Sequence, residues 1–197
     1  DHRHINTESD SEVLLNVLAH ELARASSGAS LKDEDVFAAV RAVHKRIKGS
    51  YAVIALIAGY GLLAFRDPFG IRPLVFGEAD GANGERTVLV ASETVALEGT
   101  GHKTVRDVAP GEAIFVDLEG RIHARQCAKH PTLNPCMFEF VYLARPDSVM
   151  DGVSVYQARL NLGETLAQTG IFNRDYLEHL VDAHQSGAKD YSASLWR

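Results

Sequence analysis

The sequence predicts an α+β fold in which helices flank a layered sandwich of antiparallel strands. Two observations predict it. Two stretches with apolar residues at helical spacing come first in the chain, and several strand-like runs separated by Gly- and Pro-containing turns follow them. An order of helices and then consecutive strands is typical of α+β domains, because parallel sheets need a helix between strands.

The first helix is predicted to begin within "NTESDSEVLL". Ser9-x-x-Glu12 has the form of a capping box, with Ser9 as the N-cap. Asp10 falls in the first turn, where two interpretations stay open: it complements the positive end of the helix, or it binds the ammonium group of a ligand. Spacing alone does not decide between them.

A second helix is predicted over about residues 33–48, with basic residues in its last turn. The run "YAVIALIA" that follows is uninterrupted and rich in β-branched residues, which indicates a buried strand. Further strands are predicted at "LLAFRD", "PLVFGE", "TVLVAS", "EAIFVDL" and "RIHARQC".

The α+β domain is expected to end near residue 126. Beyond a Pro-bearing connector, "CMFEFVYLA" is interpreted as a strand, "RPDSVMDG" as a loop and "SVYQARLNLGETLAQ" as an amphipathic helix. A strand followed by a helix is the first half of a βαβ unit. The predicted division is therefore 1–126, 127–168 and a helical tail over 169–197.

Composition excludes several classes of protein. The 197 residues carry a formal net charge of −6 and are 46% hydrophobic, as expected of a water-soluble globular protein. The acidic balance argues against binding of nucleic acids or anionic membranes, which need excess Lys and Arg. No apolar run approaches the roughly 20 residues of a membrane span. Two cysteines make no disulfide framework, so a cytoplasmic location is expected.

The stretch "FRDPFGIRPL" is the most distinctive one in the chain. Pro68 fixes a backbone dihedral and Gly70 permits a tight turn, so the favoured interpretation is a structural hairpin. An active-site role for Arg66 or Arg72 stays open.

No metal site is expected from this sequence. His2 and His4 form an H-x-H pair at the chain start, but further ligands at defined spacing are missing. Cys127 and Cys136 lack the C-x-x-C spacing of zinc and iron–sulfur sites.

Six stretches together resemble the successive motifs of one family. They are "HINTESDSEVLLNVLAHEL", "GSYAVIALIAGYGLLAFRDPFGIRPLVFGE", "VASETVAL", "RDVAPGEAIFV", "FEFVYLARPDS" and "SVYQARLNLGETLA". The family is that of the bacterial amidophosphoribosyltransferases, and the resemblance covers about residues 1–168. It implies an N-terminal-nucleophile (class II) glutaminase domain followed by the start of a phosphoribosyltransferase domain, with glutamine and phosphoribosyl pyrophosphate as substrates. It also implies Mg²⁺ in the phosphoribosyl half of the complete enzyme and a homo-oligomer.

The resemblance assigns roles to single residues. Asp10 matches the residue that binds the α-amino group of glutamine. Tyr142 matches a position linked to communication between the two active sites. Cys136 matches a cluster ligand of the iron–sulfur branch, whose other ligands have no counterpart here, so it is interpreted as an ordinary thiol.

Other family residues have no counterpart in the 197 residues. These are the nucleophilic N-terminal Cys, the Arg for the glutamine carboxylate, the Asn-Gly oxyanion pair and the phosphoribosyl pyrophosphate loop; residue 1 is Asp. The chain alone is therefore expected to be inactive in both half-reactions. It is also expected to be marginally stable or to associate, since sheet edges would lie open.

Residues 170–197 resemble the C-terminal helices of asparagine synthetase, whose family also has a turn similar to "RDPFGIRPL". Two alternatives therefore remain: a fragment of an asparagine-synthetase-type amidotransferase, and a non-catalytic interaction module.

Overall fold

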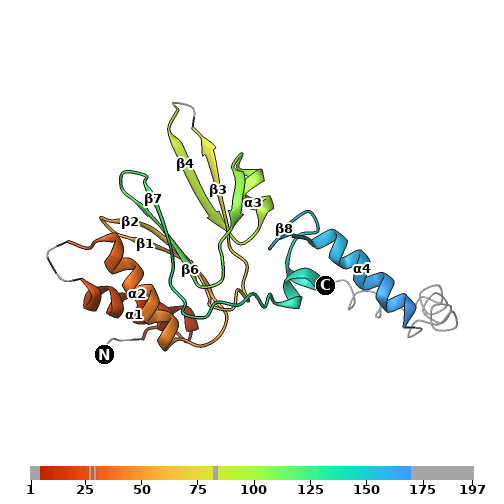
Figure 1. Ribbon diagram of the computed structural model, residues 1–197, viewed down its shortest axis with the longest axis horizontal. Helices are drawn as coiled ribbons and strands as arrows, with labels where there is room; N and C mark the ends of the chain where they lie inside the picture. The colour runs from red at the N-terminus through yellow and green to blue at the C-terminus, as the bar shows by residue number, and fades with distance from the viewer. Residues whose placement is uncertain (1–4, 27, 29, 82–83, 170–197) are drawn as a thin grey trace. The chain divides into compact units, whose positions relative to one another are not determined.

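The computed structural model describes residues 5–26, 28, 30–81 and 84–169, and the chain divides into two compact units, residues 1–155 and 156–197. The elements, in chain order, are α1 (Asp10–Ala25), α2 (Asp33–Arg46), β1 (Ala52–Ile57), β2 (Gly61–Arg66), β3 (Val75–Asp80), β4 (Arg86–Ala91), α3 (Thr94–Gly99), β5 (Lys103–Asp107), β6 (Glu112–Asp117), β7 (Ile122–Gln126), the π-helix η1 (Glu139–Leu143), β8 (Val149–Met150), β9 (Val153–Ser154) and α4 (Val155–Gln168) (Figure 1).

The two predicted N-terminal helices are confirmed as α1 and α2. Acidic residues occupy the first turn of each helix and basic residues the last turn, which complements the helix dipole at both ends. The inward stripe of α2 is fully apolar and consists of Val36, Phe37, Ala39, Val40 and Val43.

Two antiparallel sheets follow the helices. The first has four strands in the order β1-β2-β6-β7, and the second has three in the order β4-β3-β5. Sequence patterns predicted neither β5 nor α3. β5 has charged residues at both ends and only Val105 as an apolar member, and α3 is only six residues long.

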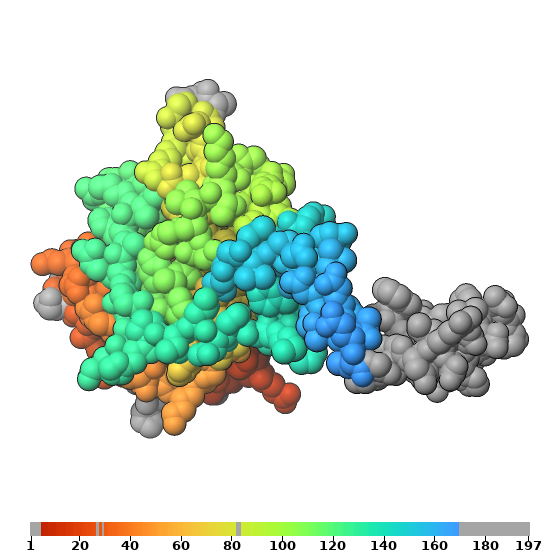
Figure 2. All heavy atoms as spheres, turned by 45° about the vertical axis from the view of Figure 1, so that its right-hand side comes forward, coloured from red at the N-terminus to blue at the C-terminus, as the bar shows by residue number. Residues whose placement is uncertain are grey.

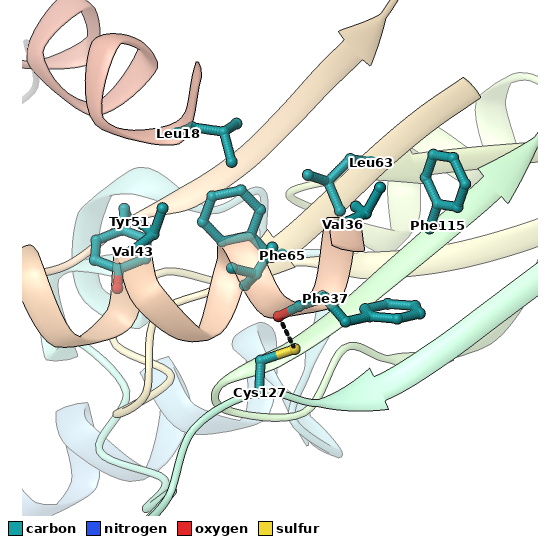
Figure 3. Close-up of a cluster of buried hydrophobic side chains, with 11 residues drawn as sticks. Leu18, Val36, Phe37, Val43, Tyr51, Leu63, Phe65, Phe115 and Cys127 are labelled. Atoms are coloured by element: carbon teal, nitrogen blue, oxygen red, sulfur yellow. Dashed lines mark hydrogen bonds between the residues drawn. The ribbon is translucent and has the colours of Figure 1, made fainter. Parts of the chain in front are cut away.

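The elements stack as α1 and α2, the four-stranded sheet, the three-stranded sheet and then α3 (Figure 1). One core lies between the two helices and the four-stranded sheet, where Phe65 and Phe115 meet Phe37 and Leu18 (Figure 3). A second core lies between the two sheets. On the outer face of the three-stranded sheet, a Cβ on Gly77 would lie 2.9 Å from Leu97 of α3, so glycine permits this close approach. The predicted fold class is confirmed.

The interpretation of β1 as a strand is confirmed, but its predicted burial is wrong. Val53 and Ala55 pack against the core under the helices. Ile54 and Leu56 point the opposite way and are 50% and 79% exposed. The reason is that β1 is an edge strand, and only Ala52 at its start packs against the core between the two sheets.

Residues 128–138 run along the surface of unit 1 (blue-green in Figure 2). Backbone N–H groups of Thr132 and Cys136 donate to the carbonyls of Pro68 and Ile71 at 3.0 and 3.1 Å. Asn134 donates to the carbonyl of Phe69 at 2.7 Å. The connector is therefore held against the turn that follows β2.

The segment after this connector differs from the sequence-based expectation. "CMFEFVYLA" contains no strand; its centre is η1, which the N–H of Ala144 closes by donating to the carbonyl of Glu139 at 2.9 Å. An apolar run of this length fits a strand and a helical segment equally well, which explains the error. The expected loop "RPDSVMDG" ends in a hairpin, β8–β9, with Asp151 and Gly152 at positive φ of 49° and 77°. Asp-Gly with two positive φ values is the signature of a type I′ turn.

The predicted helix at "SVYQARLNLGETLAQ" is confirmed as α4. Within it, Gln157 donates its side-chain N–H to the carboxamide oxygen of Asn161 at 2.9 Å. The resemblance noted for residues 170–197 lies outside the described part of the chain.

Arg66, at the end of β2, is 1% exposed and is the largest fully buried side chain among the described residues. Its Nη1 and Nη2 donate to the two carboxylate oxygens of Asp151 at 2.7 and 2.8 Å. Nε donates to the carbonyl of Arg72, and the other Nη protons go to the carbonyls of Val108 and Gly70, at 2.7 to 2.9 Å. A guanidinium has five N–H donors, and all five are used.

Asp67, the next residue, is also fully buried. Its carboxylate accepts hydrogen bonds from the backbone N–H groups of Phe69, Ile71 and Arg72. Its own carbonyl accepts from Gly111 at 2.9 Å. The interpretation of "FRDPFGIRPL" as a structural turn therefore agrees with the contacts, and a side-chain role for Arg72 is considered below.

We expect Arg66→Met to lower the free energy of unfolding by about 3–5 kcal/mol, because it leaves the carboxylate of Asp151 buried without a partner. Arg86→Met is the matched control, since Arg86 pairs with Glu78 at the surface, where solvent screens the pair and its loss should change the free energy of unfolding much less. Urea denaturation measures both values. Equal losses for the two variants would show that the Arg66 cluster does not hold the fold together.

His44 on α2 is partly buried and contacts Tyr51 and Phe65 of the core beneath the helices. Its Nδ1 is 2.8 Å from the hydroxyl oxygen of Tyr51, and its ring stacks on Tyr51 with 5.9 Å between centroids. Phe65 packs edge-on against it. Burial lowers the pKa of His44, because the charged imidazolium is disfavoured there.

This shift predicts a loss of stability in mild acid. Below its ordinary pKa of 6.5 the unfolded chain takes up a proton on His44 more readily than the folded chain does, so the free energy of unfolding falls as the pH drops. We expect His44→Phe to reduce this fall between about pH 7.5 and 5.5. His102→Asn, on a histidine outside the core, should retain the wild-type pH dependence. Chemical denaturation at a series of pH values tests this, and an unchanged slope in His44→Phe would contradict it.

Candidate functional site

Asp10 is the first residue of α1 and is exposed. Ser9 precedes it as the N-cap, and the Ser9 hydroxyl accepts the N–H of Ser11 at 3.3 Å. The predicted N-cap is therefore confirmed. The Asp10 carboxylate stands at the positive end of a helix of 16 residues, where a negative charge is favoured.

Glu12 holds the loop that leads into Asp10. In a capping box its carboxylate would bind the N–H of Ser9, but here it accepts from the N–H groups of Asn6 and Thr7 at 2.8 and 2.7 Å and from the Thr7 hydroxyl at 2.6 Å. The predicted capping box therefore does not form as expected, because the Glu12 carboxylate binds the N–H groups of Asn6 and Thr7 instead of the N–H of Ser9. The Thr7 hydroxyl and the backbone of residues 6 and 7 lower the pKa of Glu12, so it stays ionised near neutrality.

Asp10 lines an open groove of about 1000 Å³ that runs along β1. The first part of α1 forms one wall, and Arg72, Pro73 and Ser92 contribute to the lining from other segments. The charged lining residues are Asp10, Arg46, Lys48 and Arg72, so Asp10 is the single carboxylate among them. A groove with one carboxylate, three cationic side chains and apolar walls can bind a small zwitterion, because it offers an opposite charge to each charged group of that ligand.

Two of these cations already have carboxylate partners. Arg46 pairs with the buried Glu21 at 2.5 Å. Arg72 is 46% exposed and pairs with the buried Glu139 of η1 at 2.7 Å. Burial raises the pKa of Glu139, and the guanidinium of Arg72 opposes that rise. Arg72 thus connects the wall of the groove to η1. The sequence alone did not predict this contact.

Tyr142, the second residue singled out by resemblance, lies on η1 and is 65% exposed. It does not line the groove that holds Asp10. Arg72 lines that groove and pairs with Glu139 on the same π-helix as Tyr142. The roles of Asp10 and Tyr142 themselves remain predictions.

Cys127 does not have the surroundings of a nucleophile. The thiol of Cys127 is buried, and Sγ lies 3.7 Å from the carbonyl oxygen of Phe37 (Figure 3). Burial raises its pKa to about 11, which keeps it protonated. Across the described residues, no group of three or more His, Cys, Asp and Glu side chains is arranged to hold a metal ion. His2 and His4 lie outside the described residues.

The sequence and fold have clear relatives. A family model described as "Glutamine amidotransferase domain" matches residues 1–99. Amidophosphoribosyltransferase of Pseudomonas aeruginosa is 54% identical over 182 residues, 92% of this chain and 36% of that relative. The Escherichia coli amidophosphoribosyltransferase is 52% identical over 84% of this chain and 33% of its own length.

Solved structures agree with these relatives. Glutamine phosphoribosylpyrophosphate amidotransferase from Bacillus subtilis, complexed with ADP and GMP, has a TM-score of 0.67 and 32% identity, and the match covers 85% of this chain and 33% of that one. A structure titled as the allosteric regulatory enzyme of purine biosynthesis has a TM-score of 0.68, also at 32% identity, over 87% of this chain and 33% of its own.

The chain belongs to the glutamine amidotransferase domain family. Within that class, it is homologous to the amidophosphoribosyltransferases. It spans about a third of the length of the curated relatives it matches.

The Glu12 contacts predict a local effect next to Asp10. We expect Glu12→Gln to increase amide hydrogen exchange at Asn6 and Thr7, since the ionised acceptor that fixes both N–H groups is lost. Glu8→Gln, on the same exposed loop, should leave their exchange unchanged. Exchange measured by mass spectrometry on peptides covering residues 5–15 decides the matter, and equal exchange in Glu12→Gln and wild type would refute the role of Glu12.

Proposed function

We propose that this chain is part of an amidophosphoribosyltransferase, which transfers the amide nitrogen of glutamine to phosphoribosyl pyrophosphate in purine synthesis. The observation that carries the proposal is the 54% identity that extends over 92% of the chain. The layered arrangement and the match to solved phosphoribosylpyrophosphate amidotransferases support it. A cytoplasmic, homo-oligomeric enzyme with small-molecule substrates, and with no role for nucleic acid or membrane, is part of the same proposal. In the described part of the chain, no helix is both long and apolar enough to cross a bilayer.

In this proposal Asp10 binds the α-amino group of glutamine. Its carboxylate is exposed to the groove and needs no rearrangement, because Ser9 and Glu12 already fix the backbone on either side. An ammonium–carboxylate hydrogen bond is charge-assisted and contributes about 1.5–3 kcal/mol. Lys48 and Arg72 lie in the lining of the same groove and offer positive charge to the other end of an amino acid.

We further propose that the 197-residue chain by itself does not hydrolyse glutamine. Glutaminase chemistry needs an activated nucleophile, and the protonated, buried thiol of Cys127 does not supply one. Mg²⁺ is implied for the phosphoribosyl half of the complete enzyme. The described residues offer no cluster that fits a metal ion, so no step in this chain is assigned to Mg²⁺.

A non-catalytic interaction module remains the second candidate. The observation that favours it is a strip of exposed apolar residues around η1, consisting of Met137, Phe138, Val141, Tyr142 and Leu143. Contiguous exposed apolar surface commonly marks a contact with another protein or domain. Binding of glutamine separates this candidate from the first.

Isothermal titration of glutamine into the chain tests the proposed role of Asp10. We expect measurable binding by the wild type and at least about tenfold weaker binding by Asp10→Asn, because the charge-assisted bond is lost. Asp33→Asn is the matched control, since Asp33 opens α2 as Asp10 opens α1, and it should bind glutamine as the wild type does.

Two results would count against this function. The absence of heat with wild type would leave the interaction module standing, or show that the family's Arg for the glutamine carboxylate is indispensable for binding. Equal affinities of wild type and Asp10→Asn would show that glutamine binds without Asp10.

A further inference from the structure

The β8–β9 turn places a reactive dipeptide against the buried Arg66. The chain contains two Asp-Gly pairs, Asp80–Gly81 and Asp151–Gly152. Asp-Gly is the dipeptide at which an aspartate most readily isomerises, because glycine has no Cβ to hinder the approach of the carboxyl carbon to the next backbone nitrogen. Gly152 is exposed, and a Cβ built on it would meet no atom within 4 Å. The surroundings of Gly152 therefore leave room for this reaction.

The isomerisation needs no reagent other than water. The backbone nitrogen of Gly152 attacks Cγ of Asp151 and forms a C–N bond, while the carboxyl hydroxyl and the amide proton leave together as one molecule of water. A second molecule of water then opens the resulting cyclic imide. When it breaks the bond to the main-chain carbonyl, the chain continues through Cγ, and the product is isoaspartate, which has the same mass as aspartate.

The folded chain restrains Asp151 from this reaction. Both of its carboxylate oxygens accept N–H protons from Arg66, at 2.7 and 2.8 Å, and the side chain is 9% exposed. The backbone N–H of Asp151 is also fixed, since it donates to the carboxylate of Asp107 at 3.0 Å. One carboxyl oxygen must leave as water during isomerisation, so the carboxylate has to part from the guanidinium first. A buried ion pair is costly to separate, because each charge is then left without its partner.

The hairpin that carries Asp151 is small. β8 and β9 have two residues each and form two residue pairs. Short elements with few hydrogen bonds open locally more often than the core of a large sheet does. Opening of β8–β9 can therefore release Asp151 while the rest of unit 1 stays folded.

Isomerisation would prevent the hairpin from closing again. Isoaspartate adds one carbon atom to the main chain between Met150 and Gly152, and its carboxylate is attached directly to Cα, one carbon closer to the backbone. Met150 is 1% exposed and packs with Ala144 and Val155, so its position does not tolerate a longer turn. Arg66 would lose its carboxylate partner and remain buried with an unpaired charge.

We infer that Asp151–Gly152 is a modification site, at which aspartate converts to isoaspartate when the ion pair with Arg66 opens, and that the converted turn no longer binds Arg66. The conversion makes a reversible local opening permanent. The ion pair that stabilises the fold thus also protects the turn from chemical ageing.

Peptide mass spectrometry of the whole chain after several weeks at neutral pH tests the inference. Electron-transfer fragmentation distinguishes isoaspartate from aspartate, and a synthetic peptide of residues 148–154 gives the rate of isomerisation without the fold. We expect isomerisation at Asp151 in the folded chain to be at least about tenfold slower than in the peptide, because only the open hairpin reacts.

Arg66→Lys tests the protective role of the guanidinium. Lysine keeps the positive charge but not the two parallel hydrogen bonds, so we expect isomerisation at Asp151 to be at least about fivefold faster than in wild type. Asp80 is the internal control, since it lies at the exposed end of β3 and its rate should not change. Arg121→Lys, on an exposed arginine that pairs with Asp117, is the matched control variant and should leave both rates as in wild type.

Urea provides a second test with the wild type alone. The rate at Asp151 should rise with urea and reach that of the peptide once the chain is unfolded. After ageing in urea and removal of the denaturant, hydrogen exchange of peptides covering residues 145–155 should show native protection in the chains with aspartate at position 151. The chains with isoaspartate there should lack this protection.

Each outcome decides the question. A folded chain that isomerises at Asp151 as fast as the peptide overturns the inference, as do equal rates in wild type and folded Arg66→Lys. Native protection in chains that contain isoaspartate overturns the predicted failure to close. If circular dichroism shows that Arg66→Lys does not fold, the urea series decides. Glutamine binding plays no part in these measurements, so the inference and the proposed function stand or fall separately.

Discussion

The fold of unit 1 depends on one buried guanidinium. Arg66 sits at the end of β2, and its five donors reach the turn at Gly70 and Arg72, the carbonyl of Val108 after β5, and the carboxylate of Asp151. These acceptors lie in the turn after β2, directly after β5 and in the β8–β9 hairpin. A buried charge is tolerated only when it is fully paired, so the four segments must assemble together around it.

The contacts of Arg66 and Asp67 also fix the position of Arg72, which lines the candidate site. Arg66 holds the carbonyl of Arg72, and Asp67 holds its N–H, so the backbone of Arg72 is fixed from both sides. The side chain of Arg72 can then line the groove with Asp10 and still reach Glu139. The position of η1, and with it that of Tyr142, therefore depends on the same turn that closes the core.

Sequence patterns predicted helices and strands that are determined by residues close to one another in the chain. Helical spacing and capping residues gave α1, α2 and α4, and β-branched runs gave β1 and its neighbours, because these signals lie within a few residues of each other. The strand interpretation of η1 failed because an apolar run does not reveal its own hydrogen bonding. The ion pair between Arg66 and Asp151 could not be predicted for another reason. The two residues are 85 positions apart in the sequence, and only the assembled fold brings them together. The role predicted for Asp10 comes from family resemblance alone, since its spacing fits the first turn of a helix equally well.

The groove beside β1 connects the candidate site with the packing of the fold. Asp10 lines it from the start of α1, while Arg46 and Arg72 line it and also pair with the buried carboxylates of Glu21 and Glu139. A buried carboxylate that lost its partner would be costly, so each of these two guanidinium groups is held where it is by the residue that it neutralises. The positive charge of the groove therefore depends on the same contacts that anchor α1 and η1.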